Sequence, residues 1–152
     1  MVKTGSRTYA IGRIEPDFFE KGRNGRFFRI PVYSNTKLAL LLFTQEFAER
    51  LQDKDITINA SDPGIVSTNM ITMQAWFDPL TDILFRPFIK TPAQGAATAI
   101  HLALSDEAKD RNGCCYANCK KRNVSERIRH HAQQKQLWDD TEILLRQKGI
   151  RF

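Results

Sequence analysis

Apolar positions between residues 32 and 51 follow a helical period and predict the longest helix of the chain. The pattern forms two neighbouring stripes of a repeat of about 3.6 residues. One stripe holds Leu38, Leu41, Leu42 and Gln45, and the other holds Leu40, Phe43, Phe47 and Leu51. Because the two stripes together cover most of the circumference, we expect this helix to be buried on more than one side.

Shorter patterns after this helix predict two strands. Residues 55–61 alternate apolar and polar side chains and are rich in β-branched residues, as in a strand. The Asp-Pro-Gly sequence at 62–64 ends that strand in a turn, since proline and glycine both interrupt regular structure. Residues 112–119 predict a turn and a further short strand.

Two more helices are predicted in the second half of the chain. Thr91 and Pro92 suit the N-cap and the first position of a helix that runs to Leu104. Residues 125–148 predict one long amphipathic helix, and Gly149 follows it as a C-cap.

The remaining segments have no clear helical period. Residues 1–32 predict a long surface loop with short extended pieces, and the piece before Ser6 is a candidate strand. Residues 65–90 mix aromatic side chains with prolines and predict short helical pieces that form a flap or lid. Helices that alternate with strands favour a parallel α/β sheet, here of about three strands.

Composition adds limits to this picture. The 152 residues suit one domain, and 41% apolar with 26% charged residues is typical of a globular protein. The net charge of +6 permits weak attraction to anionic partners. The basic residues are scattered, however, and the short runs at 120–122 and 127–129 are typical of a solvated face. Without interleaved aromatic residues they predict no nucleic-acid partner.

The three cysteines, Cys114, Cys115 and Cys119, are few, odd in number and close together. This argues against a disulfide framework and favours free, buried or half-buried thiols in a reducing compartment. Their spacing toward His130 or His131 matches no standard zinc site, so we expect no metal. Residues 1–10 have no apolar core of a signal peptide, and no run reaches the length of a membrane span, so we expect a cytoplasmic protein with no membrane segment.

Tyr33 and Lys37 are the candidate chemical pair. Residues four apart share one face of a helix, and an ammonium beside a tyrosine favours the phenolate, which suits general acid and base chemistry. The same spacing also occurs at the polar edge of many buried helices, so both interpretations stay open on spacing alone.

The flanking residues resemble the short-chain dehydrogenase/reductase superfamily, and within it the retinol-dehydrogenase-like branch. The resemblance rests on "YSNTKLALLLFTQEFAERL", "ITINASDPGIVSTNM" and "IKTPAQGAATAIHLAL", and it extends over about residues 6–145. That family carries Y-x-x-x-K on a long helix, then a strand, a Pro-Gly turn and a threonine. The resemblance implies a partial Rossmann-like fold, a doubly wound parallel sheet, in a single partial domain over residues 1–152.

The resemblance also implies roles for individual residues. Tyr33 resembles the general acid/base, Lys37 the lysine that favours its phenolate and binds the nicotinamide ribose, and Ser6 the serine that polarises the substrate oxygen. Pro63, Gly64, Ile65 and Thr68 resemble residues beside the nicotinamide. Ser6 and Thr68 also suit plain caps, and Pro63 with Gly64 a plain turn. Asp62 departs from the histidine that often precedes the Pro-Gly turn in this branch.

The family's Gly-rich phosphate-binding loop, G-x-x-x-G-x-G, does not occur in this sequence. We therefore expect a truncated chain that begins at the family's fifth strand, with an unpaired sheet edge and marginal stability.

These features imply an oxidoreductase that uses NAD or NADP to interconvert a carbonyl and an alcohol, although the chain alone is expected to be inactive. The alternative is a catalytically inactive fragment or interaction module. Met70, Trp76 and Phe77 of the lid favour a small apolar carbonyl or alcohol substrate, and they suit packing against the core equally well. A homo-oligomer is left open.

Overall fold

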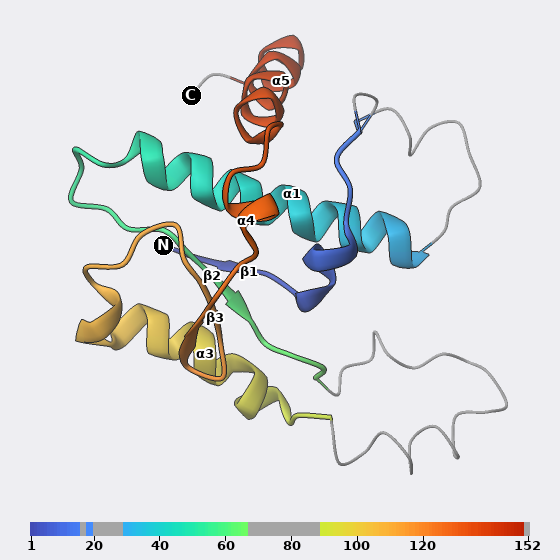
Figure 1. Cartoon of the computed structure of the whole chain (residues 1–152). Coiled ribbons are helices and arrows are strands. Elements are labelled where there is room, and N and C mark those ends of the chain that lie inside the picture. The colour runs from blue at the N-terminus through green and yellow to red at the C-terminus, as the bar shows by residue number, and fades with distance from the viewer. Residues whose placement is uncertain (16–17, 20–28, 67–88, 151–152) are drawn as a thin grey trace, which may run out of the picture.

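The computed structural model describes residues 1–15, 18–19, 29–66 and 89–150. Within them, a four-stranded sheet has the order β1-β2-β3-β4, with helices on both of its faces (Figure 1). The strands are β1 (Val2–Thr4), β2 (Asn59–Asp62), β3 (Cys115–Ala117) and β4 (Lys120–Arg122). β1, β2 and β3 are parallel, whereas β4 runs antiparallel to β3. The predicted α/β fold with about three parallel strands is confirmed, and β4 is an addition that the sequence did not predict.

The long helix α1 (Arg29–Arg50) covers one face of the sheet, and α3 (Pro92–Leu104) covers the other (Figure 1). Successive side chains of a strand point to opposite faces. Ala60 and Cys115 accordingly join the cluster that contains Leu38 and Leu42 of α1, whereas Tyr116 joins the cluster that contains Leu102 of α3. The sheet is therefore buried on both sides, as parallel sheets are.

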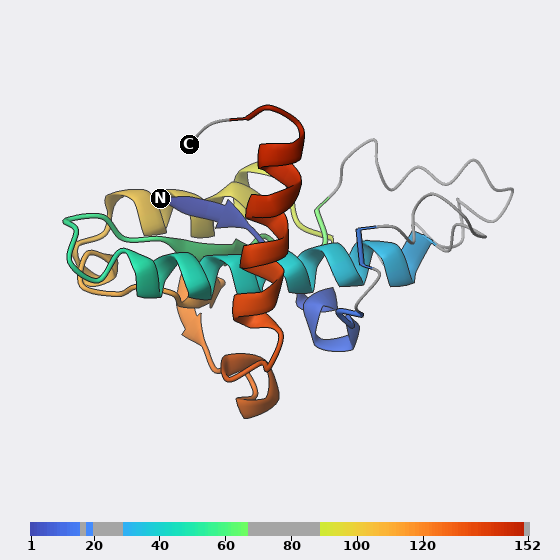
Figure 2. The ribbon, with the colours of Figure 1, turned by 90° about the horizontal axis from the view of Figure 1, so that it is seen from above.

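The expected burial of α1 on more than one side is confirmed. Leu38 and Leu42 are fully buried against the sheet. On the outer side, α5 (Gln134–Gln147) crosses α1 (Figure 2). The Trp138 ring of α5 stacks on Phe43 with 5.2 Å between ring centroids and lies 5.6 Å from that of Phe47.

The predicted single helix over residues 125–148 is wrong. Two helices take its place, α4 (Glu126–Arg129) and α5, separated by residues 130–133. Ile128 of α4 is buried beside the sheet, whereas Leu137 of α5 is buried against α1. The chain leaves the helical conformation at His130, with φ −119° and ψ 49°, and Ile128 and Leu137 on either side of this break are buried in the same core cluster.

The strand predicted over residues 55–61 begins later, at Asn59. Ahead of it, the Ile58 N–H donates to the Asn112 side chain at 2.9 Å rather than to a neighbouring strand. The long loop predicted over residues 1–32 is also wrong in part. It contains β1, which confirms the candidate strand before Ser6, and the 3-10 helix η1 (Arg7–Ile11). Residues 16–17 and 20–28 lie outside the described part.

The two helix ends that were predicted from capping residues, the start of α3 and the end of α5, are confirmed. Thr91 and Gln94 form a reciprocal capping box at the start of α3. After α5, Gly149 has φ +75°, and the N–H groups of Gly149 and Ile150 donate to the carbonyls of Arg146 and Leu145. This is the Schellman pattern. None of the helices in the described segments has the length and apolar character to cross a membrane.

Candidate active site

The candidate residues gather where β1 and β2 end. The carboxyl ends of parallel strands lie on one edge of a sheet, and this is where α/β proteins bind ligands. Gly5 follows β1, and its N–H donates to the carbonyl of Ser61 in β2 at 2.7 Å. The loop that carries Ser6 and the turn that carries Pro63 and Gly64 therefore begin side by side.

Tyr33 and Lys37 lie together on the first turns of α1. The Lys37 Nζ is 5.4 Å from the centroid of the Tyr33 ring, and Tyr33 is 40% exposed. The same ammonium donates a hydrogen bond to the backbone carbonyl of Thr4 at 3.0 Å. The pair is thus held beside the carboxyl end of β1, two residues before Ser6.

Ser6 is the N-cap of η1, the structural role that was left open for it. Its hydroxyl oxygen accepts hydrogen bonds from the backbone N–H of Thr8 at 3.4 Å and from the Thr8 hydroxyl at 3.2 Å. In both bonds Ser6 is the acceptor, so its own O–H proton is not used in them. A cap at this position is therefore compatible with donation to a ligand oxygen.

The η1 helix is locked onto the same part of α1. A Cβ atom on Gly12 would lie 2.5 Å from the Ser34 carbonyl oxygen and 2.8 Å from the Leu38 Cβ. The backbone N–H of Arg13 donates to the Asn35 side chain at 2.8 Å. Glycine thus allows the close approach that fixes the Ser6 loop against the turn carrying Tyr33 and Lys37. Gly12 lies in the segment predicted to be a surface loop, so its role in this close packing was not predicted.

The turn after β2 is held by a buried ion pair. Gly64 has φ +77°, a conformation that favours glycine. Its N–H donates to one carboxylate oxygen of Asp62 at 2.9 Å, and the guanidinium of Arg122 donates to the other at 3.1 Å. Asp62 is 3% exposed, so this pair is part of the turn and not a surface contact.

Arg122 is the residue that sequence reasoning missed. It belongs to the run at 120–122, which was predicted to be a solvated face, and for Arg122 that is wrong. The missed signal is the turn between β3 and β4, where Asn118 and Cys119 have φ 53° and 59°. Two positive φ values are what a two-residue hairpin turn requires, and the resulting register pairs Arg122 with Cys115.

Of the other predicted nicotinamide contacts, only Ile65 lies in the described part. Its carbonyl accepts from the Lys90 N–H at 2.8 Å, and Val66 forms a parallel bridge with Lys90. Thr68 and the predicted substrate residues Met70, Trp76 and Phe77 lie outside the described residues. The same holds for the predicted lid except at its two ends.

Tyr9 and Cys115 are two buried titratable groups in the core next to the site. Burial raises the pKa of Tyr9, with smaller contributions from Cys115 and Asp62 that Arg122 opposes. Burial, with a contribution from Asp62, raises the pKa of the Cys115 thiol to about 11. Both groups are therefore protonated at neutral pH. The predicted free thiols are confirmed, since all three cysteines are unpaired and Cys115 is buried.

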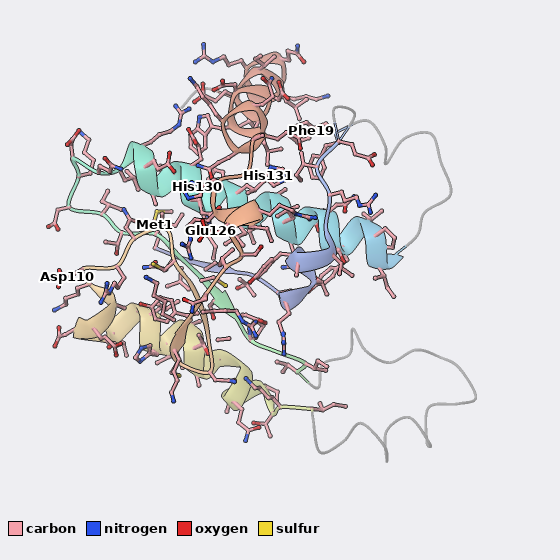
Figure 3. All side chains as sticks on the ribbon, in the orientation of Figure 1. Met1, Phe19, Asp110, Glu126, His130 and His131 are labelled. Atoms are coloured by element: carbon pink, nitrogen blue, oxygen red, sulfur yellow. The ribbon has the colours of Figure 1, made fainter. Side chains whose placement is uncertain are left out.

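The histidines considered for zinc lie at the end of α4, next to Glu126 (Figure 3). His130 Nε2 is 3.4 Å from a Glu126 carboxylate oxygen, and burial lowers the pKa of His131, with a smaller effect of Arg127. In the described segments, no three His, Cys, Asp or Glu side chains are grouped as a metal would require.

Comparison with known proteins identifies relatives in both sequence and fold. The family model for short chain dehydrogenases matches residues 21–76. Retinol dehydrogenase 14 of Homo sapiens is 34% identical over 150 residues, which is 95% of this chain and 44% of that protein. Retinol dehydrogenase 12 of Mus musculus is 35% identical over 152 residues, which is 100% of this chain and 46% of that protein. The chain thus spans less than half the length of these relatives.

Solved structures agree on the fold. A crystal structure from Mycobacterium paratuberculosis matches with a TM-score of 0.65 and 21% identity, over 95% of this chain and 49% of that one. A short chain dehydrogenase from Burkholderia cenocepacia, solved in complex with NADP, matches with a TM-score of 0.52 and 21% identity, over 76% of this chain and 42% of that one. The solved structures show the same fold, and the sequence matches show that this chain belongs to the short-chain dehydrogenase/reductase family and is similar to its retinol-dehydrogenase-like members.

Proposed function

We propose that this chain supplies the proton-transfer site of an NAD(P)-dependent oxidoreductase that interconverts a carbonyl and an alcohol. The observation that carries the proposal is the placement of Tyr33 and Lys37 beside the carboxyl end of β1, with the Lys37 ammonium bonded to Thr4 and Ser6 two residues further on. Three groups that donate or exchange protons are thus anchored to one strand end.

In this proposal each residue has a separate role. Tyr33 exchanges a proton with the substrate oxygen, and its exposed ring leaves the hydroxyl within reach of a ligand. Lys37 places its ammonium beside the Tyr33 ring and holds the pair at the end of β1 through its bond to Thr4. Ser6 donates its O–H to the substrate oxygen, where negative charge develops during reduction.

The residues fit the nicotinamide end of the cofactor. Gly64 is held at positive φ in the turn that follows β2, at the edge of the sheet where α/β proteins bind ligands. Lys37, Pro63, Gly64, Ile65 and Thr68 would hold the nicotinamide and its ribose, and the bound cofactor would supply or accept the hydride. The sequence contains no Gly-rich loop of the kind that binds the pyrophosphate of a dinucleotide.

The names of the relatives suggest the class of substrate. Retinol is a long apolar alcohol, and we propose an apolar alcohol or aldehyde of that kind, in contact with Met70, Trp76 and Phe77. The segment at 65–90 would then serve as the lid of a single partial domain. The choice between NAD and NADP is left to the assay.

An inactive fragment or interaction module is the second candidate. The missing Gly-rich loop favours it, because a dinucleotide binds weakly without a site for its phosphates. On this view, Tyr33 and Lys37 are retained from an enzyme ancestor and do not act in this chain.

A hybrid enzyme tests the proposal. Residues 1–150 would replace the aligned segment of retinol dehydrogenase 14, which supplies the missing cofactor half. Reduction of retinal and of a panel of aldehydes and ketones would be followed with NADH and NADPH, beside the same assay on the present chain alone. We expect turnover by the hybrid, loss of about 100-fold or more in Tyr33→Phe, and no turnover by the chain alone.

Cofactor binding shows whether the Tyr33→Phe hybrid is folded. This variant lacks only one hydroxyl, so it should keep its cofactor affinity. Equal turnover in both hybrids would contradict the role of Tyr33. A hybrid that folds and binds NADPH but reduces no carbonyl would favour the inactive module instead.

A further inference from the structure

We propose that Asp62 and Arg122 are positioning residues that hold the Gly64 turn in the conformation required beside the nicotinamide. The inference deepens the proposed function and rests on it for the identity of the ligand. It concerns the ion pair itself, whose geometry is independent of any ligand.

Asp62 uses its two carboxylate oxygens in different directions. One oxygen accepts the N–H of Gly64 at 2.9 Å, and the other accepts from Arg122 Nη1 at 3.1 Å. Asp62 is 3% exposed, and the Arg122 side chain is 26% exposed. A charge-assisted hydrogen bond to a buried carboxylate is stronger than one between neutral groups. The carboxylate therefore transmits the position of Arg122 directly to the backbone of the turn.

Arg122 is in turn fixed by the hairpin of β3 and β4. The Asn118 side chain at the hairpin tip accepts from Lys90 Nζ at 2.6 Å. The Cys119 N–H donates to the hydroxyl of Thr98 in α3 at 3.2 Å. The hairpin is thus attached to α3 at its tip and presents Arg122 to Asp62 at its far end.

The Lys90 side chain lies against Gly64, on the side where a Cβ atom would be. A Cβ atom on Gly64 would lie 3.3 Å from both Cε and Nζ of Lys90. Gly64 is therefore held by Asp62 on its N–H and is covered by the Lys90 side chain. Loss of Arg122 would leave the buried Asp62 carboxylate without its ion-pair partner, and the turn would rearrange to expose that charge.

The Gly64 amide resonance in the ¹H–¹⁵N spectrum of the full chain reports on this contact directly. Arg122→Met should move that resonance, because the carboxylate reorients once its partner is gone. Arg122→Lys keeps the charge and should restore most of the original position. Asp62→Asn keeps an oxygen acceptor without the charge and should give an intermediate shift. Arg129→Met is the matched control, because it removes an exposed ion pair with Glu126.

NADPH titration of the hybrid enzyme gives the functional readout. Arg122→Met should weaken NADPH binding by about tenfold or more, the equivalent of 1.4 kcal/mol, and Arg122→Lys should recover most of it. If Arg122→Met does not fold, Arg122→Lys and Asp62→Asn decide by the same two measurements.

The inference is overturned if the folded variants of Asp62 and Arg122 leave the Gly64 resonance where Arg129→Met leaves it. It is also overturned if the resonance moves while NADPH affinity stays unchanged in a hybrid that binds NADPH. Failure of the proposed function looks different, since no form of the hybrid would then reduce a carbonyl, whereas the shift of Gly64 would persist.

Discussion

The ammonium of Lys37 donates to the backbone carbonyl of Thr4 at 3.0 Å, a contact between residues 33 positions apart. Lys37 belongs to α1 and Thr4 ends β1, so this hydrogen bond joins the helix of the candidate site to the end of the strand. It also places the ammonium 5.4 Å from the ring centroid of Tyr33. One side chain therefore both anchors the site and supplies its positive charge.

Lys37→Met tests the anchoring role in the chain itself. The substitution keeps most of the aliphatic stem and removes the donor, so the free energy of unfolding should fall by about 1 kcal/mol. Urea denaturation followed by far-UV circular dichroism measures the change. Lys135→Met, at an exposed position of α5, is the control and should change stability by less than about 0.5 kcal/mol. Equal effects at both positions would argue against the contact with Thr4.

Gly12→Ala tests the packing of η1 on α1. The new Cβ would meet the Ser34 carbonyl oxygen at 2.5 Å, which is shorter than any contact it can tolerate, so η1 must move. We expect a loss of about 1–3 kcal/mol in the free energy of unfolding. Gly5→Ala is a matched comparison, because its Cβ would meet Ser61 at an ordinary 3.6 Å. If Gly5→Ala is as destabilising as Gly12→Ala, the close approach at Gly12 is not the cause.

The parts of the fold that were predictable from sequence depend on local signals. Local signals include the stripes of α1, the N-cap Thr91 with Pro92, and the C-cap Gly149. Each acts within one or two turns of helix, so these residues alone are informative. The proximity of Tyr33 and Lys37 was predictable for the same reason, because the two residues are at positions i and i+4 of one helix.

The parts that were missed depend on contacts between distant segments. The break at His130 separates two helices whose buried residues, Ile128 and Leu137, lie in one core cluster with α1 and the sheet, and no local pattern reveals that packing. Asp62 and Arg122 are 60 residues apart, and their pairing exists only because a two-residue hairpin turns β4 back along β3. Arg122 had the appearance of a surface residue because its neighbours Lys120 and Lys121 are exposed.

Trp138→Ala tests the attachment of α5 to α1. The indole stacks on Phe43 at 5.2 Å, and the Arg50 guanidinium lies 4.6 Å from its centroid, while its N–H donates to Glu142. Removal of this half-buried ring should lower the free energy of unfolding by about 2–4 kcal/mol. Trp138→Phe keeps an aromatic ring and should lose about half as much, as measured by chemical denaturation. If the two variants were equally stable, ring stacking would not hold α5 in place.

Cys115 predicts a loss of stability at alkaline pH. Burial raises the pKa of its thiol from 9.0 to about 11 in the folded chain, so folding favours the protonated form. Its contribution is fully present below pH 9 and is lost as the pH rises through about 11, because the unfolded chain ionises first. A shift of this size corresponds to about 2–3 kcal/mol.

Urea denaturation under reducing conditions at pH 8 and pH 11 should show this loss in the wild type and a smaller one in Cys115→Ala. Because burial also raises the pKa values of Tyr9 and Tyr116, the difference between the two proteins is the decisive quantity. Parallel pH profiles for the two would refute the assignment to Cys115.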